Sequence, residues 1–308
     1  MANQLNGLYL PNIGVEVQEL TQNPINETTP SFHSAKKRTL KTYFDSTQKS
    51  NSFLVMSWNV WFEDSYAQPR IYRIISIIKE KNPDFVCLQE LTHETFKLIE
   101  NRLSPSYQIF QAFISEDNPY GTCIMCNRNT TRIVDNEDNP YYYDYANSKM
   151  SRRVIGCEVE FTKFVAPRFH ILTTHLESLA ENDQAREVQF NVIKEVTKSL
   201  KNFILVGDFG IWNSNEEIEK NISRSRMKDA WIEMGCPYKA KYTYNFKKNR
   251  SVRDRSQHRF DRMYYHSSII RPKIMGLVGR DVVSDEVKIH PSNHFGLITE
   301  FTVDQNEN

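Results

Sequence analysis

The sequence has no stretch that approaches about 18 consecutive apolar residues, so we expect no transmembrane helix. It has no basic start followed by an apolar run, and we therefore expect no secretory signal. Neither sign of charge is in excess, because 39 Lys and Arg residues stand against 38 Asp and Glu residues. With 39% apolar and 25% charged residues, the composition is globular and excludes a mostly disordered chain.

Cysteine is scarce, and the five residues form an odd, scattered set, which favours reduced thiols in a cytosolic or nuclear compartment. Cys123 and Cys126 form a C-x-x-C pair, a spacing that zinc sites and redox motifs use. Their segment has the pattern of a strand, in which positions three apart face opposite sides. No second pair completes four zinc ligands, so we interpret both as buried structural cysteines.

Residues 1–50 are polar, rich in Asn, Thr, Ser and Gln, and weakly periodic, so we expect a mobile leader. Its short run Lys36-Lys37-Arg38 suits nuclear import, and a solvated chain is the alternative. The folded domain is predicted over residues 51–303, a length that can bury one large core. Residues 304–308 form a polar tail.

From residue 52 onward, short apolar runs alternate with helical periodicity. Isoleucines at 71, 74, 75 and 78 have the i, i+3, i+4, i+7 spacing of a helix face, and Pro69 suits a helix start. A second long helix is marked by apolar residues between Val188 and Leu200. Strands are predicted at 53–57, 85–88, 107–113, 122–127, 154–161, 169–174, 203–206, 260–265, 274–278 and 295–301, with a helix at 93–103. Two sheets face to face, flanked by helices, would fit this α/β or α+β pattern.

Polar residues follow the apolar runs at five places, and strand ends are where a layered fold gathers a site. The five clusters are Ser57-Trp-Asn59, Leu88-Gln-Glu90, Thr173-Thr-His175-Leu-Glu-Ser178, Gly207-Asp208 and Pro291-Ser-Asn-His294. Each is weak by itself, but their order and spacing together are specific.

In this order the clusters resemble the signature of the endonuclease/exonuclease/phosphatase superfamily, which runs W-N, Q-E, G-D-x-N and S-D-H. Within it, Thr174–Ser178, Arg186 with Gln189, Arg259–Arg262 and Pro291–Gly296 resemble the tyrosyl-DNA phosphodiesterase 2 branch. The resemblance covers roughly residues 52–303. It implies an α/β fold, a four-layer sandwich with two central β-sheets flanked by helices, and a site at one edge.

The residue types suit phosphodiester hydrolysis, which needs a divalent cation, an activated water and donors for developing charge. Glu90 offers the hard oxygen ligand that Mg²⁺ or Mn²⁺ takes, and a helix-start cap is the alternative. Asn59 would bind a metal-bound water or position Asp208, unless it is a turn asparagine. Asp208 would orient or deprotonate the attacking water, and it would also suit a helix cap.

Two histidines complete the predicted catalytic set. His294 would donate to a phosphate oxygen as charge builds. By resemblance, Asp261 is the carboxylate that raises the pKa of His294 and fixes its tautomer. A strand-face carboxylate paired with Arg259 or Arg262 is the alternative for Asp261. His175 matches a family histidine beside the scissile phosphate, and a histidine satisfied by backbone is the alternative.

Substrate contacts are predicted on three side chains. Arg152, or its neighbour Arg153, would grip a phosphate, although both also suit a plain surface position. Tyr244 stands where the family has an aromatic residue near the substrate, and Phe260 would wall the same groove by stacking on single-stranded DNA or would simply pack in the core. Between Lys247 and Arg262, seven basic residues against two acidic ones suggest a loop that contacts nucleic-acid backbone, with a solvated loop as the alternative.

Two motif positions depart from the superfamily pattern. Gly210 replaces the asparagine of G-D-x-N and removes an amide that would hold the scissile phosphate or the attacking water. Asn293 replaces the aspartate of S-D-H and loses a negative charge, so metal affinity should fall. Trp212 also stands where the branch has an arginine. The loss of one positioned donor costs on the order of 10²–10³ in rate.

The leading hypothesis is a Mg²⁺- or Mn²⁺-dependent hydrolase of DNA-damage repair, a nuclease-like phosphodiesterase that removes tyrosine from a 5′-phosphotyrosyl DNA end. Water attacks phosphorus and the phenolate, a good leaving group, departs. The alternative is a catalytically impaired member that acts as a DNA-end or protein binding module. The resemblance also implies a monomer in the nucleus, with the cytoplasm as a second location, single-stranded DNA as a further partner and no membrane.

Overall fold

The computed structural model describes residues 51–112, 120–213 and 216–304, which all belong to one compact unit, Thr47–Asn308. The predicted leader, residues 1–50, lies outside the described residues, as do residues 305–308 of the predicted tail. The domain boundaries inferred from the sequence therefore stay predictions.

Two β-sheets carry the fold. The strands are β1 (Ser52–Asn59), β2 (Phe85–Thr92), β3 (Tyr107–Ala112), β4 (Tyr120–Asn127), β5 (Thr131–Ile133), β6 (Tyr141–Asp144), β7 (Arg153–Phe161), β8 (Phe169–His175), β9 (Phe203–Asp208), β10 (Lys228–Asp229), β11 (Tyr244–Asn245), β12 (Gln257–His258), β13 (Asp261–His266), β14 (Ile270–Val278) and β15 (Gly296–Val303). The first sheet has the order β14-β15-β1-β2-β4-β3. The second has the order β10-β13-β9-β8-β7-β5, with β6 paired to β7, and β11 pairs with β12.

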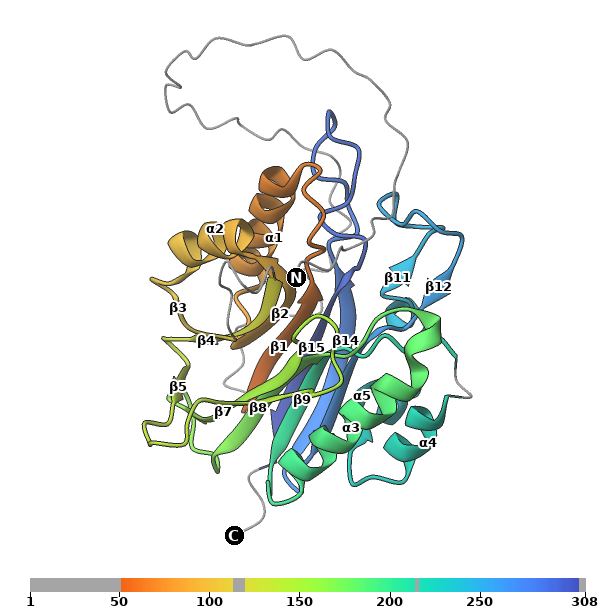
Figure 1. Ribbon diagram of the computed structural model, residues 1–308. Helices are drawn as coiled ribbons and strands as arrows, with labels where there is room; N and C mark the ends of the chain where they lie inside the picture. The colour runs from red at the N-terminus through yellow and green to blue at the C-terminus, as the bar shows by residue number, and fades with distance from the viewer. Residues whose placement is uncertain (1–50, 113–119, 214–215, 305–308) are drawn as a thin grey trace, which may run out of the picture. The chain divides into compact units, whose positions relative to one another are not determined.

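Helices cover the outer faces of both sheets. They are α1 (Ala67–Lys81), α2 (His93–Leu103), α3 (Asp183–Thr197), α4 (Glu217–Ser223) and α5 (Ala230–Glu233), with 3-10 turns η2 (Ala180–Asn182) and η3 (Tyr238–Ala240). In Figure 1, α1 and α2 lie over the first sheet, and α3 and α4 lie over the second. The order helix, sheet, sheet, helix confirms the predicted four-layer α/β sandwich. No helix within the described ranges is long and apolar enough to cross a membrane.

The isoleucine pattern explains α1. All four isoleucines of the predicted face are buried, so this face packs on the first sheet. The helix begins at Ala67, which leaves Pro69 in the first turn. It ends at Asn82, where φ is 44° and the backbone N–H bonds back to Ile78 O. Pro83 follows and cannot continue the helix.

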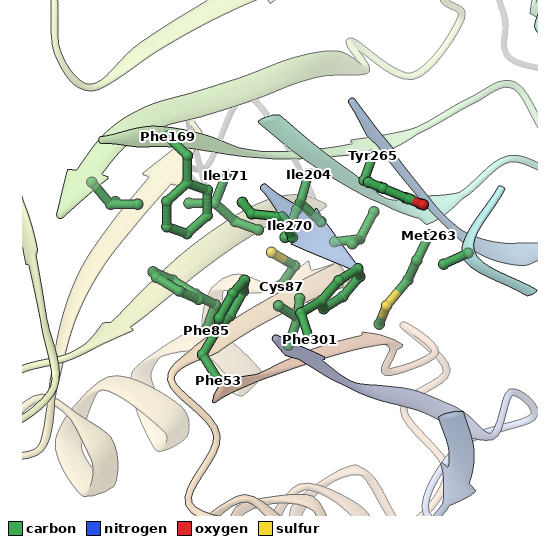
Figure 2. Close-up of a cluster of buried hydrophobic side chains, with 14 of the residues drawn as sticks. Phe53, Phe85, Cys87, Phe169, Ile171, Ile204, Met263, Tyr265, Ile270 and Phe301 are labelled. Carbon is green, nitrogen blue, oxygen red and sulfur yellow. The ribbon is translucent and has the colours of Figure 1, made fainter. Parts of the chain in front are cut away.

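Aromatic side chains fill the space between the sheets (Figure 2). Phe53 of β1 stacks on Phe301 of the neighbouring strand β15, with ring centroids 5.6 Å apart. Phe169 of β8, on the facing sheet, lies 5.5 Å from Phe53 and 5.4 Å from Phe85 of β2. Contacts of Phe169 therefore join the two sheets across one apolar layer.

The cysteines are all free thiols, and every one except Cys236 is buried. Cys123 and Cys126 lie on β4, as predicted, and Cys126 belongs to the core between the sheets together with Cys87 and Cys157. Among the residues that the structure describes, no group of metal-ligating side chains includes a cysteine. The C-x-x-C pair is therefore part of the packing, as the strand pattern indicated.

The strand registers bring the polar clusters to one end of the sandwich. In the first sheet, Asn59 at the end of β1 pairs with Gln89 on the parallel strand β2. In the second, His175 at the end of β8 pairs with Asp208 on the parallel strand β9. Asp208 also pairs with Asp261, the first residue of the antiparallel strand β13. Polar side chains from both sheets therefore meet at the same edge.

Candidate active site

The side-chain amide of Asn59 joins two carboxylates that come from different sheets. Its Nδ2 donates to Glu90 Oε1 and to Asp208 Oδ2, each at 2.9 Å. Its Oδ1 accepts a hydrogen bond from Trp61 N at 2.9 Å, which fixes the orientation of the amide. Asn59 thus holds Glu90 and Asp208 side by side, the arrangement expected if it positions Asp208.

Glu90 reaches this place through a β-bulge. Between the paired residues Leu88 and Leu91, two residues of β2 oppose a single residue of β4. Glu90 itself has a φ of 59°, in the left-handed region that non-glycine residues seldom adopt. Its Oε2 accepts a hydrogen bond from Phe62 N at 3.1 Å, while Oε1 is bound by Asn59. The bulge therefore turns the carboxylate toward the strand end.

Neither carboxylate caps a helix, the alternative left open by the sequence. The helix after Glu90 is α2, and Thr92 and Thr95 form its capping box. Asp208 Oδ1 accepts from the backbone N–H of Gly210 at 2.9 Å in a local turn, and the next described helix begins only at Glu217. Both carboxyl groups are thus directed into the site.

His294 and Asp261 form a buried pair. His294 Nδ1 lies 2.7 Å from Asp261 Oδ2, and Nε2 lies 3.9 Å from Asp208 Oδ2. The pair leaves the Nε2 proton of His294 directed toward the carboxylates of the site. The alternative partners of Asp261 bind elsewhere, because Arg259 pairs with Asp229 and Arg262 pairs with Glu219.

Burial and neighbouring charges set the protonation of these groups. Burial raises the pKa of Glu90. Burial would also raise the pKa of Asp208, but the charge of His294 and the hydrogen bonds from Asn59 and the Gly210 backbone bring it below its ordinary value. Burial would lower the pKa of His294, but the charge and hydrogen bond of Asp261 raise it to about 9. Near neutral pH, His294 is therefore a cation that faces the Asp208 carboxylate.

His175 lies against the same carboxylates but stays neutral. Its Nε2 is 3.5 Å from Asp208 Oδ2 and 3.8 Å from Glu90 Oε1. Burial, and after it the charge of Arg152, holds the pKa of His175 well below its ordinary value. Its Nδ1 is buried and has no hydrogen-bond partner among the described residues. The alternative of a histidine satisfied by backbone is therefore not what the structure contains.

Helix α3 anchors the segment that carries His175. Glu177 N donates to Gln189 Oε1 at 2.8 Å, and Arg186 Nη1 donates to Glu177 O at 3.0 Å. Arg186 is fully buried and pairs with Glu216 at 3.0 Å, so its charge is compensated. The arginine and glutamine singled out by the resemblance thus fix the chain just after His175.

Trp58 holds the backbone of His294 in place. The buried indole Nε1 donates to His294 O at 2.9 Å. Its ring lies against Gly279 and Gly296, where an added Cβ would approach ring atoms to 2.3 and 2.6 Å. Only glycine fits at these two places, which bring the start of β15 close to the tryptophan of the W-N cluster.

Two overlapping groups of side chains have the spacing of a cation site. Glu90, His175 and Asp208 form one, and Asp208, Asp261 and His294 form the other, with ligand atoms within 4.8 Å of one another in each. In the second group, Asp261 and His294 already bind each other at 2.7 Å, so the first group fits a cation better. Glu90 and Asp208 offer the hard oxygens that Mg²⁺ and Mn²⁺ take. Burial of three carboxylates against one imidazolium also favours a bound cation.

Both departed motif positions lie at the site. Gly210 follows Asp208 closely, has a φ of 56° and no side chain, and its backbone N–H donates to Asp208 Oδ1. Asn293 is half-buried beside His294, and its Oδ1 lies 3.3 Å from Ser292 Oγ. The amide and the carboxylate of the superfamily motifs are thus missing from positions next to catalytic candidates.

Arg152 lies beside His175 with its guanidinium already engaged. Nε and Nη2 donate to Tyr120 Oη at 2.9 and 2.6 Å, and Nη1 donates to Leu176 O. Tyr120, Arg152 and His175 line one small cleft together with Met150. No local pattern in the sequence marks Tyr120 as a site residue, because its link to Arg152 arises only from the fold. A phosphate contact by Arg152 stays a prediction.

A row of rings extends from His294 along the rim of the site. Tyr244 lies 5.2 Å from His294 and 5.3 Å from Phe260 between ring centroids. His258 stacks on Phe260 at 4.6 Å, and Trp212 lies 4.6 Å from His258. Phe260 is buried, whereas Tyr244, His258 and Trp212 are half-buried. We call these four side chains the aromatic row, in which Phe260 packs behind the more exposed rings.

Comparison with known proteins decides the family. The model of the Endonuclease/Exonuclease/phosphatase family matches residues 56–285. The chain belongs to this family. Tyrosyl-DNA phosphodiesterase 2 of Xenopus laevis is 24% identical over 296 residues, which cover 92% of this chain and 75% of that relative. A 5′-tyrosyl-DNA phosphodiesterase of Caenorhabditis briggsae is 25% identical over 256 residues, covering 80% and 69%.

Solved structures share the fold. Danio rerio TDP2 complexed with single strand DNA product matches with a TM-score of 0.73 at 24% identity, over 82% of this chain and 99% of the other. An endonuclease/exonuclease/phosphatase family protein from Bacteroides thetaiotaomicron matches with a TM-score of 0.66 at 17% identity, over 83% and 99%. The W-N, Q-E, G-D and S-x-H clusters of this chain meet at one edge of the sandwich, as the resemblance to the family implied.

Proposed function

We propose that this protein is a divalent-metal-dependent phosphodiesterase that hydrolyses 5′-phosphotyrosyl DNA ends. One observation carries the proposal: the Asn59 amide holds Glu90 and Asp208 together, and the protonated His294 faces them. The names of the relatives supply the substrate class. A nuclear location and a monomeric state stay predictions.

The chain supplies most parts that the reaction needs. Glu90 would hold the cation, with Asp208 and His175 next to it. When bound, Mg²⁺ or Mn²⁺ supplies positive charge that stabilises the phosphoryl oxygens. Asp208, kept ionised by the charge of His294 and the hydrogen bond from Asn59, accepts the proton of the attacking water. His294 donates from Nε2 to a phosphoryl oxygen, and Asp261 keeps this imidazole protonated.

The groups that remain suit a substrate with a good leaving group. The missing amide at position 210 and the missing carboxylate at 293 weaken the stabilisation of charge and the hold on the cation. A tyrosine phenolate carries its own negative charge well, so it departs with less help than an alkoxide does. This chemistry favours phosphotyrosyl ends over plain phosphodiesters of DNA.

Hydrolysis of a 5′-tyrosyl oligonucleotide in ¹⁸O-labelled water tests the proposal. We expect one labelled oxygen in the new 5′-phosphate and none in the released tyrosine, because water attacks phosphorus. The Gly210→Asn/Asn293→Asp variant, run beside the natural protein, restores both motif positions. Turnover only in that variant, with tight binding by both proteins, would instead make the natural chain a DNA-end binding module.

A further inference from the structure

Five of the seven basic residues in segment 247–262 fall into two sets. Three of its arginines are engaged in ion pairs: Arg253 with Glu63, Arg259 with Asp229 and Arg262 with Glu219. The pairs of Arg259 and Arg262 are largely buried, so their charge is compensated inside the fold, whereas the Arg253 pair lies at the surface. Lys248 and Arg250, in contrast, are exposed and lie within 4 Å of no carboxylate oxygen in the part of the chain that the structure describes. The sequence alone does not separate the two sets.

The unpaired cations converge with two others on one groove. The groove has a volume of about 470 Å³ and lies between the segment after β11 and the connection from β14 to β15. Lys248 and Arg250 line it from the first segment, and Arg280 and Lys288 line it from the second. Two carboxylates, Asp281 and Asp285, also border the groove, but neither is within ion-pair distance of these four cations.

His290 joins the two segments that line this groove. The buried ring accepts a hydrogen bond from Arg250 N at Nδ1, at 3.0 Å, and its Nε2 donates to Arg280 O at 3.2 Å. A backbone N–H can only donate, so this contact fixes the tautomer of His290. Ser251 Oγ accepts a hydrogen bond from His290 N at 3.0 Å. The two segments are therefore locked together with their cationic side chains on one surface.

The groove is joined to the active site. His290 stands four positions before His294, a reach of at most roughly 14 Å of chain. Between them, Ser292 O accepts a hydrogen bond from Asn249 Nδ2 at 2.9 Å, and Ser292 Oγ donates to Asn59 O at 2.6 Å. Figure 1 shows the β14–β15 connection and the segment after β11 at the same end of the sandwich as the end of β1. The groove and His294 are therefore separated by a short stretch of chain, which a bound DNA strand is long enough to span.

We infer that this groove, defined by Lys248, Arg250, Arg280 and Lys288, is a binding site for the phosphate backbone of the DNA strand that enters the active site. The inference rests on the proposed function. Two guanidinium groups can each bind a phosphate with paired hydrogen bonds, and the lysines add point charges. Among the residues that line the groove, Val282 alone is apolar, so the groove offers little apolar surface to the acyl chains of an anionic membrane. The contact is to backbone, and it carries no base specificity.

The test compares substrates that do and do not reach the groove. Arg250→Ala/Arg280→Ala/Lys288→Ala removes three side chains, while the backbone atoms that contact His290 remain. The matched control Lys79→Ala/Lys97→Ala/Lys201→Ala removes the same charge from exposed positions elsewhere. The substrates are a 5′-tyrosyl trinucleotide and a 5′-tyrosyl single strand of about 20 nucleotides, a length that offers many phosphates for contact.

We expect KM for the long strand to be about tenfold or more higher in the groove variant. A plot of the logarithm of the binding constant against the logarithm of the salt concentration should be less steep by about two units, since each lost phosphate contact contributes roughly 0.7. Its kcat, and its kinetics on the trinucleotide, should match the natural protein. The independent variant Lys248→Glu/Lys288→Glu should act in the same direction. Unchanged KM on the long strand, or an equal rise in the surface control, would overturn the inference.

A binding measurement separates this inference from the proposed function. Fluorescence anisotropy with the same two lengths of 5′-phosphorylated DNA needs no turnover. If the natural protein hydrolyses nothing yet binds the long strand more tightly than the short one, and the groove variant loses that difference, the groove stands and the enzymatic proposal falls. If tyrosyl DNA is hydrolysed and the two lengths bind equally well, the groove is not a DNA site.

Discussion

His294 Nδ1 lies 2.7 Å from Asp261 Oδ2 at the buried edge of the sandwich, although the two residues are 33 positions apart in the chain. Burial would lower the pKa of His294, but this carboxylate raises it to about 9. The catalytic proposal depends on this pair, because it keeps a proton on Nε2 at neutral pH and directs it toward Asp208.

Replacing Asp261 with asparagine should move the pH profile. Without this carboxylate, only Asp208 and Glu90 oppose the effect of burial, so the pKa of His294 falls from about 9 toward its ordinary value of about 6.5. The alkaline limb of the single-turnover rate should then move from about pH 9 in the natural protein toward neutrality. Rates from about pH 5 to pH 10 measure this. Coincident alkaline limbs in the two proteins would rule out His294 as the titrating donor.

The same pair should make stability depend on pH. The pKa of His294 is about 9 in the folded state, above an unfolded value of about 6.5. Its contribution is therefore fully present below about pH 6.5 and is lost as the pH rises through about 9. The difference in unfolding free energy between the natural protein and Asp261→Asn should shrink across this window. Urea unfolding at several pH values measures it, and a constant difference would contradict the assigned pKa.

Removing the Asn59 side chain should separate the two carboxylates that it bridges. In Asn59→Ala, Glu90 and Asp208 lose their common donor, and we expect a fall of about 10²–10³ in kcat together with a weaker response to Mg²⁺. Ser65→Ala, an exposed position in the following loop, is the matched control. Metal titrations of the single-turnover rate test this expectation. A variant with the natural rate and metal dependence would show that the bridge has no role.

Restoring the departed motif positions should increase activity. At Gly210 the φ of 56° suits asparagine better than other side chains, and an added Cβ would lie 3.0 Å from Glu177 O, so a small shift is needed. We expect Gly210→Asn to raise kcat by about tenfold or more, whereas Gly210→Ala adds the same Cβ without the amide and should not. Equal rates in the two variants would show that the amide does nothing here.

Asn293→Asp should act on the cation. It adds a negative charge beside His294, so the concentration of Mg²⁺ that gives half the maximal rate should fall. The matched control is Asn293→Ser, which removes the amide without adding charge. Rate measurements over a range of Mg²⁺ concentrations compare the three proteins. An unchanged half-maximal concentration in Asn293→Asp would place this residue outside the influence of the cation.

Much of the fold was predictable because apolar runs and helical spacing are local. The long strands and α1, α2 and α3 lie within a few residues of the predicted ranges, and the clusters at their ends meet at one edge. Short elements such as β5, β6 and α4 carry too few residues for a periodic pattern, and the sequence did not indicate them. β5 and β6 form by pairing with β7, and α4 packs against α3, so their structure depends on tertiary contacts.

The sequence indicated which residues belong to the site better than it indicated how they are arranged. The bulge that turns Glu90 follows from the register between β2 and β4, and the contact of Arg152 with Tyr120 follows from the approach of β4 to the segment before β7. Neither is encoded in a local pattern. The division of the basic segment into paired arginines and free cations likewise depends on Asp229 and Glu219, which come from other elements.

The aromatic row should bind a base. Trp212 and Tyr244 are half-buried, and stacking on such rings contributes about 1–3 kcal/mol per base. Trp212→Ala should therefore weaken the binding of single-stranded DNA by about 5-fold to 150-fold, with less quenching of a 2-aminopurine placed near the 5′ end. Tyr238→Ala removes an exposed aromatic outside the row and should leave both readouts unchanged. Equal quenching with Trp212→Ala would contradict stacking on this ring.

The central claim is that Glu90 and its partners make this protein a metal-dependent phosphodiesterase of tyrosyl DNA. Single-turnover hydrolysis of a 5′-tyrosyl oligonucleotide, with excess enzyme and with Mg²⁺ or Mn²⁺, tests it most directly when the natural protein is compared with Glu90→Gln. We expect free tyrosine and a 5′-phosphorylated oligonucleotide from the natural protein, and a rate lower by at least about 10² in the variant. Metal-dependent hydrolysis at the same rate in both proteins would contradict it.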